Sequence, residues 1–155
     1  MTIHTIRVAP VKKSVRVSAS QARAFEVFTA RFDSWWPKSH HIGKVEMKEA
    51  VIEPRAGGRW YEKGVDDSEC NWGTVLAWEP PSRVVLSWHI NGKFQPDEGV
   101  QSEVEIRFIP ESANATRVEL EHRIAAADAE DIRGAVDSPQ GWGSLLELFA
   151  QRATA

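Results

Sequence analysis

The chain has 155 residues, 42% of them hydrophobic and 26% charged, which is typical of one globular domain, here residues 1–155. Nineteen Lys and Arg residues against 22 Asp and Glu residues give a net charge of −3 without any basic run, which argues against nucleic acid as a partner. No membrane-length apolar stretch and no signal-peptide core occur, so we expect no membrane insertion and a cytoplasmic protein.

The N-terminal part predicts one strand and two helices. Residues 11–17 alternate between apolar and polar, which predicts a strand. Ser20 can cap a helix over 20–32, whose apolar stripe is Phe25, Phe28 and Phe32. Trp35, Trp36 and Pro37 then stop this helix or bend it into a second short one, and 39–47 is predicted to be a loop.

The central part switches to a period of two, with turn residues at short intervals, which indicates an antiparallel meander. The six predicted strands cover 48–54, 58–64, 70–79, 83–90, 100–109 and 115–124. Alternation groups three inward sets on one expected concave face: Val84, Leu86 and Trp88; Val104, Ile106 and Phe108; and Val118, Leu120 and His122.

The C-terminal part predicts a long helix. Residues 125–137 form a loop or a short helix, and Ser138 with Pro139 then provides a helix start. The following stripe, Trp142, Leu145, Leu146 and Phe149, needs a surface to bury against, and the concave sheet supplies it. The predicted fold is therefore α+β in the order β-α-α-β6-α, a seven-stranded curved antiparallel sheet around a long C-terminal helix.

Several short motifs occur in an informative order: Pro54 with Gly57-Gly58 and Trp60-Tyr61, Gly73 to Pro81, Arg83 to Trp88, Val118 to His122, and Gly141-Trp142. Together they resemble the Activator of Hsp90 ATPase homologue-like family of the START/Bet v 1-like (SRPBCC) superfamily. The resemblance implies a helix-grip fold with an internal hydrophobic cavity, which relatives use for lipids, sterols, hormones or polyketides. The co-chaperone that names the family has an additional N-terminal chaperone-binding domain, whereas only 10 residues here precede the first predicted strand. This departure argues against Hsp90 activation.

Seven Trp residues beside one Tyr are more than packing usually recruits, and they favour wide apolar walls. The predicted faces and the resemblance together give a set of ligand-binding residues. They are Trp60, Trp88, Ile106, Leu120, His122, Trp142, Leu146 and Phe149. Of Trp35 and Trp36, we expect one to pack the core and the other to cover the cavity. Trp72 and Trp78 share a strand face and mark a partner surface if that face points outward.

The polar candidates leave alternatives open. An inward His122 can bind a ligand or transfer protons, or it can be a neutral imidazole bonded to a backbone carbonyl, and the second is favoured. Glu62 shares a face with Trp60, and a solvated rim position is favoured over a buried one. Adjacent His40 and His41 point in different directions, so no metal site is expected.

The sequence thus favours non-enzymatic binding of a small hydrophobic molecule, with no cofactor, no metal and no catalytic residues. One alternative is a module that interacts with an Hsp90-type chaperone. Another is a cyclase-like or hydrolase-like enzyme that uses His122 with Glu62 or Arg59. Monomer and homodimer are both compatible with the sequence.

Overall fold

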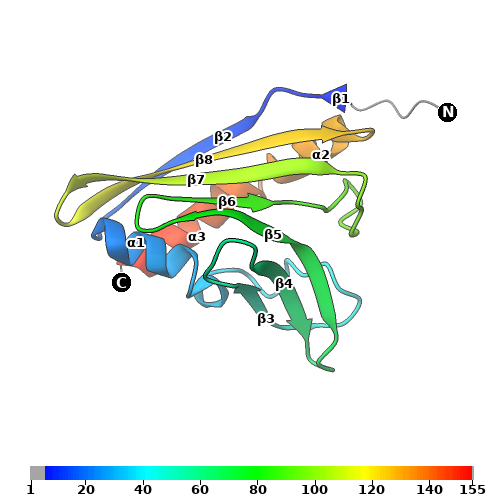
Figure 1. Ribbon diagram of the computed structural model, residues 1–155, viewed down its shortest axis with the longest axis horizontal. Helices are drawn as coiled ribbons and strands as arrows, with labels where there is room; N and C mark the ends of the chain where they lie inside the picture. The colour runs from blue at the N-terminus through cyan, green and yellow to red at the C-terminus, as the bar shows by residue number, and fades with distance from the viewer. Residues whose placement is uncertain (1–5, 155) are drawn as a thin grey trace.

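The computed structural model describes residues 6–154 as a curved antiparallel sheet with the C-terminal helix running along one face (Figure 1). The strand order is β1-β8-β7-β6-β5-β4-β3, and β2 also pairs with β8. Because β1 and β2 follow each other along the same edge of β8, the sheet has the seven positions that the sequence predicts. The strands are β1 Ile6–Arg7, β2 Val11–Val17, β3 Met47–Ile52, β4 Arg59–Gly64, β5 Glu69–Glu79, β6 Arg83–Ser87, β7 Gln101–Ser112 and β8 Ala115–Ala126.

The N-terminal helix α1, Gln21–Phe28, is shorter than the predicted helix over 20–32. Ser20 caps it as predicted, because its hydroxyl accepts the N–H of Arg23 at 3.2 Å. At its other end the Thr29 hydroxyl donates to the carbonyl of Phe25 at 2.7 Å, and such side-chain bonding competes with the helical ladder. A second short helical element is present, the 3₁₀ turn η1, Phe32–Ser34, but it ends before Trp35 instead of forming at Trp35 to Pro37.

The C-terminal part contains α2, Ala129–Val136, and α3, Trp142–Thr154. The predicted helix start at Ser138 and Pro139 is wrong by three residues. The Ser138 hydroxyl instead donates to the Ala135 carbonyl at 2.7 Å and closes α2. A Cβ atom on Gly141 would lie 2.0 Å from the Val136 carbonyl oxygen, so the chain turns too tightly here for α3 to begin earlier.

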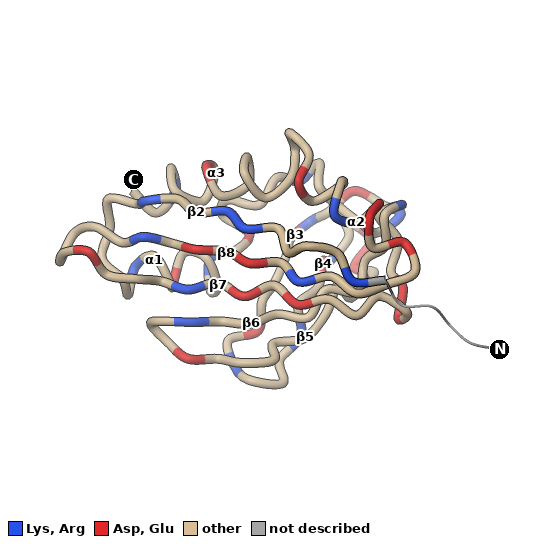
Figure 2. The backbone as a smooth tube through the Cα atoms, turned by 90° about the horizontal axis from the view of Figure 1, so that it is seen from above, with Lys and Arg blue, Asp and Glu red and all other residues tan. Residues whose placement is uncertain are grey.

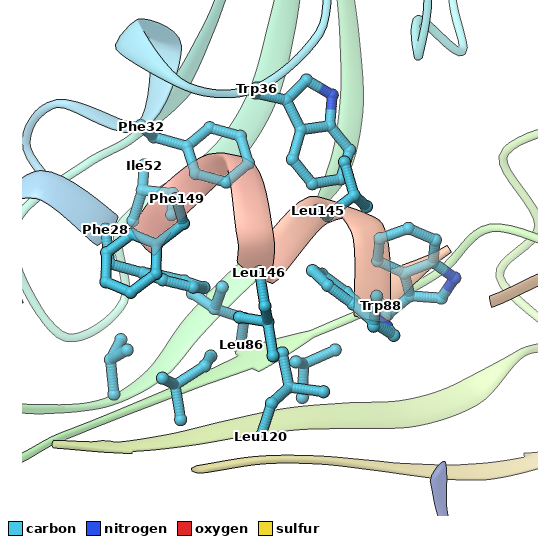
Figure 3. Close-up of a cluster of buried hydrophobic side chains, with 14 of the residues drawn as sticks. Phe28, Phe32, Trp36, Ile52, Leu86, Trp88, Leu120, Leu145, Leu146 and Phe149 are labelled. Atoms are coloured by element: carbon cyan, nitrogen blue, oxygen red, sulfur yellow. The ribbon is translucent and has the colours of Figure 1, made fainter. Parts of the chain in front are cut away.

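The residues on the inner face of the sheet are those that strand alternation predicts. Register aligns Leu86 with Val104 and His122, and Val84 with Ile106 and Leu120, across three strands. The α3 stripe of Trp142, Leu145, Leu146 and Phe149 packs on this face, and every member is at most 5% exposed. Figure 3 shows Leu146 next to Leu86 and Leu120, between α3 and the sheet.

The outer face carries charge instead: β2 has only basic charged residues, while basic and acidic residues follow one another along β8 and β7 (Figure 2). At its centre Glu105 is only 5% exposed and accepts hydrogen bonds from Arg83 Nε at 2.7 Å, Arg107 Nε at 2.9 Å and Arg123 Nη1 at 2.9 Å. Burial raises the pKa of this carboxyl, but the three guanidinium groups outweigh it and hold the pKa at about 2. None of the helices within residues 6–154 has the length and hydrophobicity to span a bilayer.

Candidate functional site

Five tryptophans form a closed cycle of ring contacts inside the sheet. Its members, each at most 6% exposed, are Trp36, Trp72, Trp60, Trp88 and Trp142 in the order of contact. Neighbouring ring centroids in this tryptophan cycle lie 5.3 to 5.9 Å apart. Such separations are typical of attractive aromatic pairs. Five of the seven tryptophans therefore pack against one another in the interior.

A mostly apolar cavity of about 320 Å³ opens beside the cycle. We call it the mouth cavity. The loop after Trp36, the β6–β7 loop that carries Phe94 and the α2–α3 junction surround it. Its lining residues are Trp36, Ser39, His40, His41, Ile42, Trp88, Phe94, Ala135, Val136, Gln140, Gly141, Trp142 and Leu145.

The three indoles that line the mouth cavity have their N–H groups bonded to protein. Trp36 Nε1 donates to the His40 carbonyl and Trp88 Nε1 to the Ile90 carbonyl, each at 3.1 Å. Trp142 Nε1 donates to Nδ1 of His122 at 3.0 Å. Since these donors are used, the three indoles, each at most 6% exposed, have no N–H group left for a ligand.

His122 lies behind Trp142 and is 0% exposed. Its Nδ1 accepts from an indole, so the proton of the neutral ring must sit on Nε2, which lies 3.2 Å from the Ser102 hydroxyl. That hydroxyl donates onward to the Trp88 carbonyl at 2.6 Å. Burial, and then the nearby Arg123 charge, lowers the pKa of His122 to about 3. The imidazole is therefore neutral with both nitrogens occupied, and its partners are Trp142 and Ser102 where a backbone carbonyl was expected.

The prediction of a solvated rim position for Glu62 is wrong, because this residue is 1% exposed. Its Oε1 accepts the N–H groups of Ile42 and Gly43, the latter at 2.9 Å, and the indole N–H of Trp72 at 3.0 Å. Three donors thus compensate the buried carboxylate without an arginine. The bonds tie the loop that carries His41 and Ile42 to β4.

Arg59, the other proposed partner of His122, lies on the opposite side of β4. Its guanidinium sits 4.1 Å from the centre of the Tyr61 ring and 3.1 Å from Glu69. Both nitrogens of His122 bond to Trp142 and Ser102, and within residues 6–154 neither Glu62 nor Arg59 is hydrogen-bonded to it, so the expected acid–base group is not formed.

Two histidines reach the mouth cavity from the tethered loop. His40 Nε2 lies 2.9 Å from the Gln140 carbonyl, and His41 Nδ1 lies 2.8 Å from the Gly43 carbonyl. A carbonyl only accepts, so each of these nitrogens carries a proton. In the neutral ring, His41 Nε2 is left as a lone-pair acceptor, and within residues 6–154 it has no hydrogen-bond partner. Among the imidazole nitrogens of His40 and His41, it is therefore the one without a partner.

The predicted ligand-binding residues separate into two groups. Trp88 and Trp142 line the mouth cavity. Trp60, Ile106, Leu120, His122, Leu146 and Phe149 lie in the packed core, each at most 1% exposed. Within residues 6–154, Trp60 Nε1 is the one buried side-chain polar atom without a hydrogen-bond partner.

The structure also shows where the two other predicted tryptophan pairs lie, Trp35 with Trp36 and Trp72 with Trp78. Trp35 packs against Phe28 and Phe149 in the core, as expected for one of the pair. Trp36 lines the mouth cavity but is only 5% exposed, so its role as a cover stays a prediction. The condition for a partner surface at Trp72 and Trp78, an outward strand face, is not met. Trp72 is 0% exposed within the tryptophan cycle, and Trp78 packs edge-on against Phe25 at 5.0 Å.

Sequence patterns missed the loop contributions to the cavity, above all Phe94 and the segment 39–42. The adjacent histidines are a visible signal in the sequence, because two neighbouring polar rings in a loop can reach a cavity without binding a metal. Within residues 6–154, no three His, Cys, Asp or Glu side chains come together as metal ligands.

The fold and cavity place the protein in the helix-grip, START/Bet v 1-like class. The family described as Activator of Hsp90 ATPase homolog 1-like protein matches residues 18–154, and the chain belongs to this family. A comparison with curated proteins gives no match.

Solved structures extend the comparison. An anthrahydroquino-gamma-pyrone synthase, Txn09, is 39% identical over 94% of this chain and 97% of its own, with a TM-score of 0.62. The self-sacrificing resistance protein CalC from Micromonospora echinospora is 29% identical over 94% of both chains, with a TM-score of 0.69. A norcoclaurine synthase from Thalictrum flavum is 12% identical over 99% of this chain and 95% of its own, with a TM-score of 0.62, and shows the shared fold alone.

Proposed function

We propose that the protein binds a compact, planar, aromatic small molecule in the mouth cavity without converting it. The observation that carries the proposal is the apolar cavity bounded by Trp36, Trp88 and Trp142, whose N–H groups are all used inside the protein. Rings that cannot hydrogen-bond a ligand contribute flat apolar contact, which favours stacking. A volume of about 320 Å³ lies near the lower end of small-molecule sites, so it suits fused rings better than a long lipid.

The most similar structures named above support the same ligand class. Txn09 is called an anthrahydroquino-gamma-pyrone synthase, a name that describes a fused aromatic ring system. At 39% identity across nearly both chains, a related ligand shape is a reasonable expectation for this protein.

A binding panel tests the proposal. Anthraquinone sulfonate, a long-chain fatty acid and a sterol are titrated against the protein by isothermal calorimetry, with thermal unfolding alongside. The planar compound should bind best and raise the melting temperature, because it binds only the folded state. Preference for the fatty acid or sterol, or no binding by any of the three, would contradict the proposal.

Two neighbouring substitutions on α2 locate the site. Ala135→Leu adds bulk to a residue that lines the mouth cavity and should weaken binding. Gly134→Leu is the matched control, because Gly134 does not line the cavity and a Cβ atom there meets nothing within 4 Å. Equal affinities for the two variants would place the ligand elsewhere.

A second candidate is an enzyme that acts on the same ligand class, and His41 favours it. His41 lines the cavity, its Nδ1 is held by a carbonyl, and its Nε2 has no hydrogen-bond partner within residues 6–154, an arrangement that suits proton transfer. The test is mass spectrometry of a bound polyketide-type substrate after incubation, with His41→Gln compared to His40→Gln. Turnover lost only in His41→Gln would establish the enzyme, whereas an unchanged ligand supports binding alone.

A further inference from the structure

Phe94 stands apart from the other aromatic residues around the mouth cavity. It lines the cavity, yet 54% of its surface is exposed, whereas Trp36, Trp88 and Trp142 are at most 6% exposed. Among the aromatic pairs formed within residues 6–154, none includes Phe94. The Phe94 ring is therefore accessible at the cavity, while the three indoles are held by packing.

The backbone of Phe94 is also unusual, with a φ of 58° in the left-handed region. Bulky residues seldom adopt this conformation, which Gly and Asn adopt with little strain. A large apolar side chain in a strained and exposed position is unfavourable for the free protein on both counts. Folding stability alone would favour Asn or Gly here.

Hydrogen bonds hold the loop around Phe94 in place. Asn91 Oδ1 accepts the N–H groups of Lys93 at 2.9 Å and Gln95 at 3.1 Å. The Gly92 N–H donates to Asp128 Oδ2 at 3.1 Å and connects the loop to the start of α2. The loop therefore presents residue 94 at the cavity entrance in a defined orientation.

We propose that Phe94 determines the ligand preference of the mouth cavity by stacking on the outward face of a planar aromatic ligand. The inner face of the ligand contacts Trp88 and Trp142. A flat ring system fits between two aromatic surfaces, while a bulky globular ligand of similar volume does not gain the outer contact. This inference rests on the proposed function and identifies the residue that selects for planarity.

The decisive variant is Phe94→Asn, because Asn tolerates the left-handed backbone. It should leave the melting temperature equal or higher while weakening anthraquinone sulfonate about three- to tenfold, the size of one lost aromatic contact. Phe94→Trp should retain binding of the same compound. Adamantane carboxylate, which is not planar, should bind wild type and Phe94→Asn equally.

Val65→Asn is the control, since Val65 is an exposed apolar side chain, 59% exposed, that does not line the cavity. It should leave affinity for the probe unchanged. If wild type binds the probe and Phe94→Asn binds it equally well, the role of Phe94 is refuted while the proposed function stands. If wild type binds no planar compound, both proposals fail together. Equal losses for the planar and globular probes would also refute selection for planarity.

Discussion

The protein should become markedly less stable in mild acid, because His122 is protonated there in the unfolded chain but not in the folded protein. Burial holds the pKa of this imidazole at about 3 in the folded state, against an ordinary value of 6.5. Between these two values the unfolded chain binds one proton more than the folded chain, so stability falls as pH falls. At pH 5.0, which lies 1.5 units below the unfolded pKa, the loss is about 2 kcal/mol relative to neutral pH.

The perturbation that isolates this effect is His122→Gln. A glutamine offers a carbonyl oxygen to the Trp142 N–H and an amide N–H to the Ser102 hydroxyl, so it can replace both hydrogen bonds without titrating. Urea denaturation at pH 7.5 and 5.0 measures the free energy of unfolding of both proteins. The wild type should lose about 2 kcal/mol more than the variant over this interval.

Subtracting the variant removes the contributions of other titrating groups, which the two proteins share. A difference between wild type and His122→Gln that stays constant from pH 7.5 to 5.0 would show that His122 takes up a proton in the folded state, and would refute the buried neutral imidazole. If the glutamine does not fold, His122→Asn supplies the same polar atoms on a shorter side chain.

Three further perturbations follow from the packing. Glu62→Ala should destabilise the protein by about 2–4 kcal/mol in urea denaturation, because it leaves the buried Trp72 N–H and two backbone N–H groups without their acceptor. The control is Glu147→Ala at an exposed position, which should change the free energy of unfolding by less than about 0.5 kcal/mol. Similar losses in the two variants would contradict this role of Glu62. The low pKa of Glu105 contributes stability that is present above about pH 4.5 and is lost as pH falls toward 2. The free energy of unfolding of Glu105→Gln should therefore fall less than that of the wild type over this pH range. Leu146→Ala should cost about 3 kcal/mol by opening a space in the core; a loss below about 1 kcal/mol would indicate a loosely packed interior.

The local patterns of the sequence predicted the elements and their buried faces well. Strand alternation placed Leu86, Val104 and His122 on one face, and the structure aligns them in register across three strands. The stripe on α3 was predicted for the same reason, since side-chain direction in a strand or helix follows from a fixed period. The start of α3 was misplaced because the Gly141 turn depends on contact with α2, which the local pattern does not contain.

The cavity and its polar groups were decided by tertiary structure. Glu62 appeared as a rim residue because two of its three donors come from a loop 19 and 20 residues earlier in the chain, and the third is Trp72 on β5. The His40 ring is held by the carbonyl of Gln140, which lies 100 residues away in the chain, a contact that no local pattern contains.

The tryptophan excess was visible in the composition, and it correctly indicated an aromatic interior. Which indoles pack the core and which face the mouth cavity depends on how neighbouring side chains fill the space, and adjacent Trp35 and Trp36 have opposite roles. The sequence by itself thus determined the sheet, the helix and the apolar character of the interior, because these follow from side-chain period and composition. The position of the cavity required the tertiary structure, because loops and packing bring together residues whose spacing in the chain carries no such period.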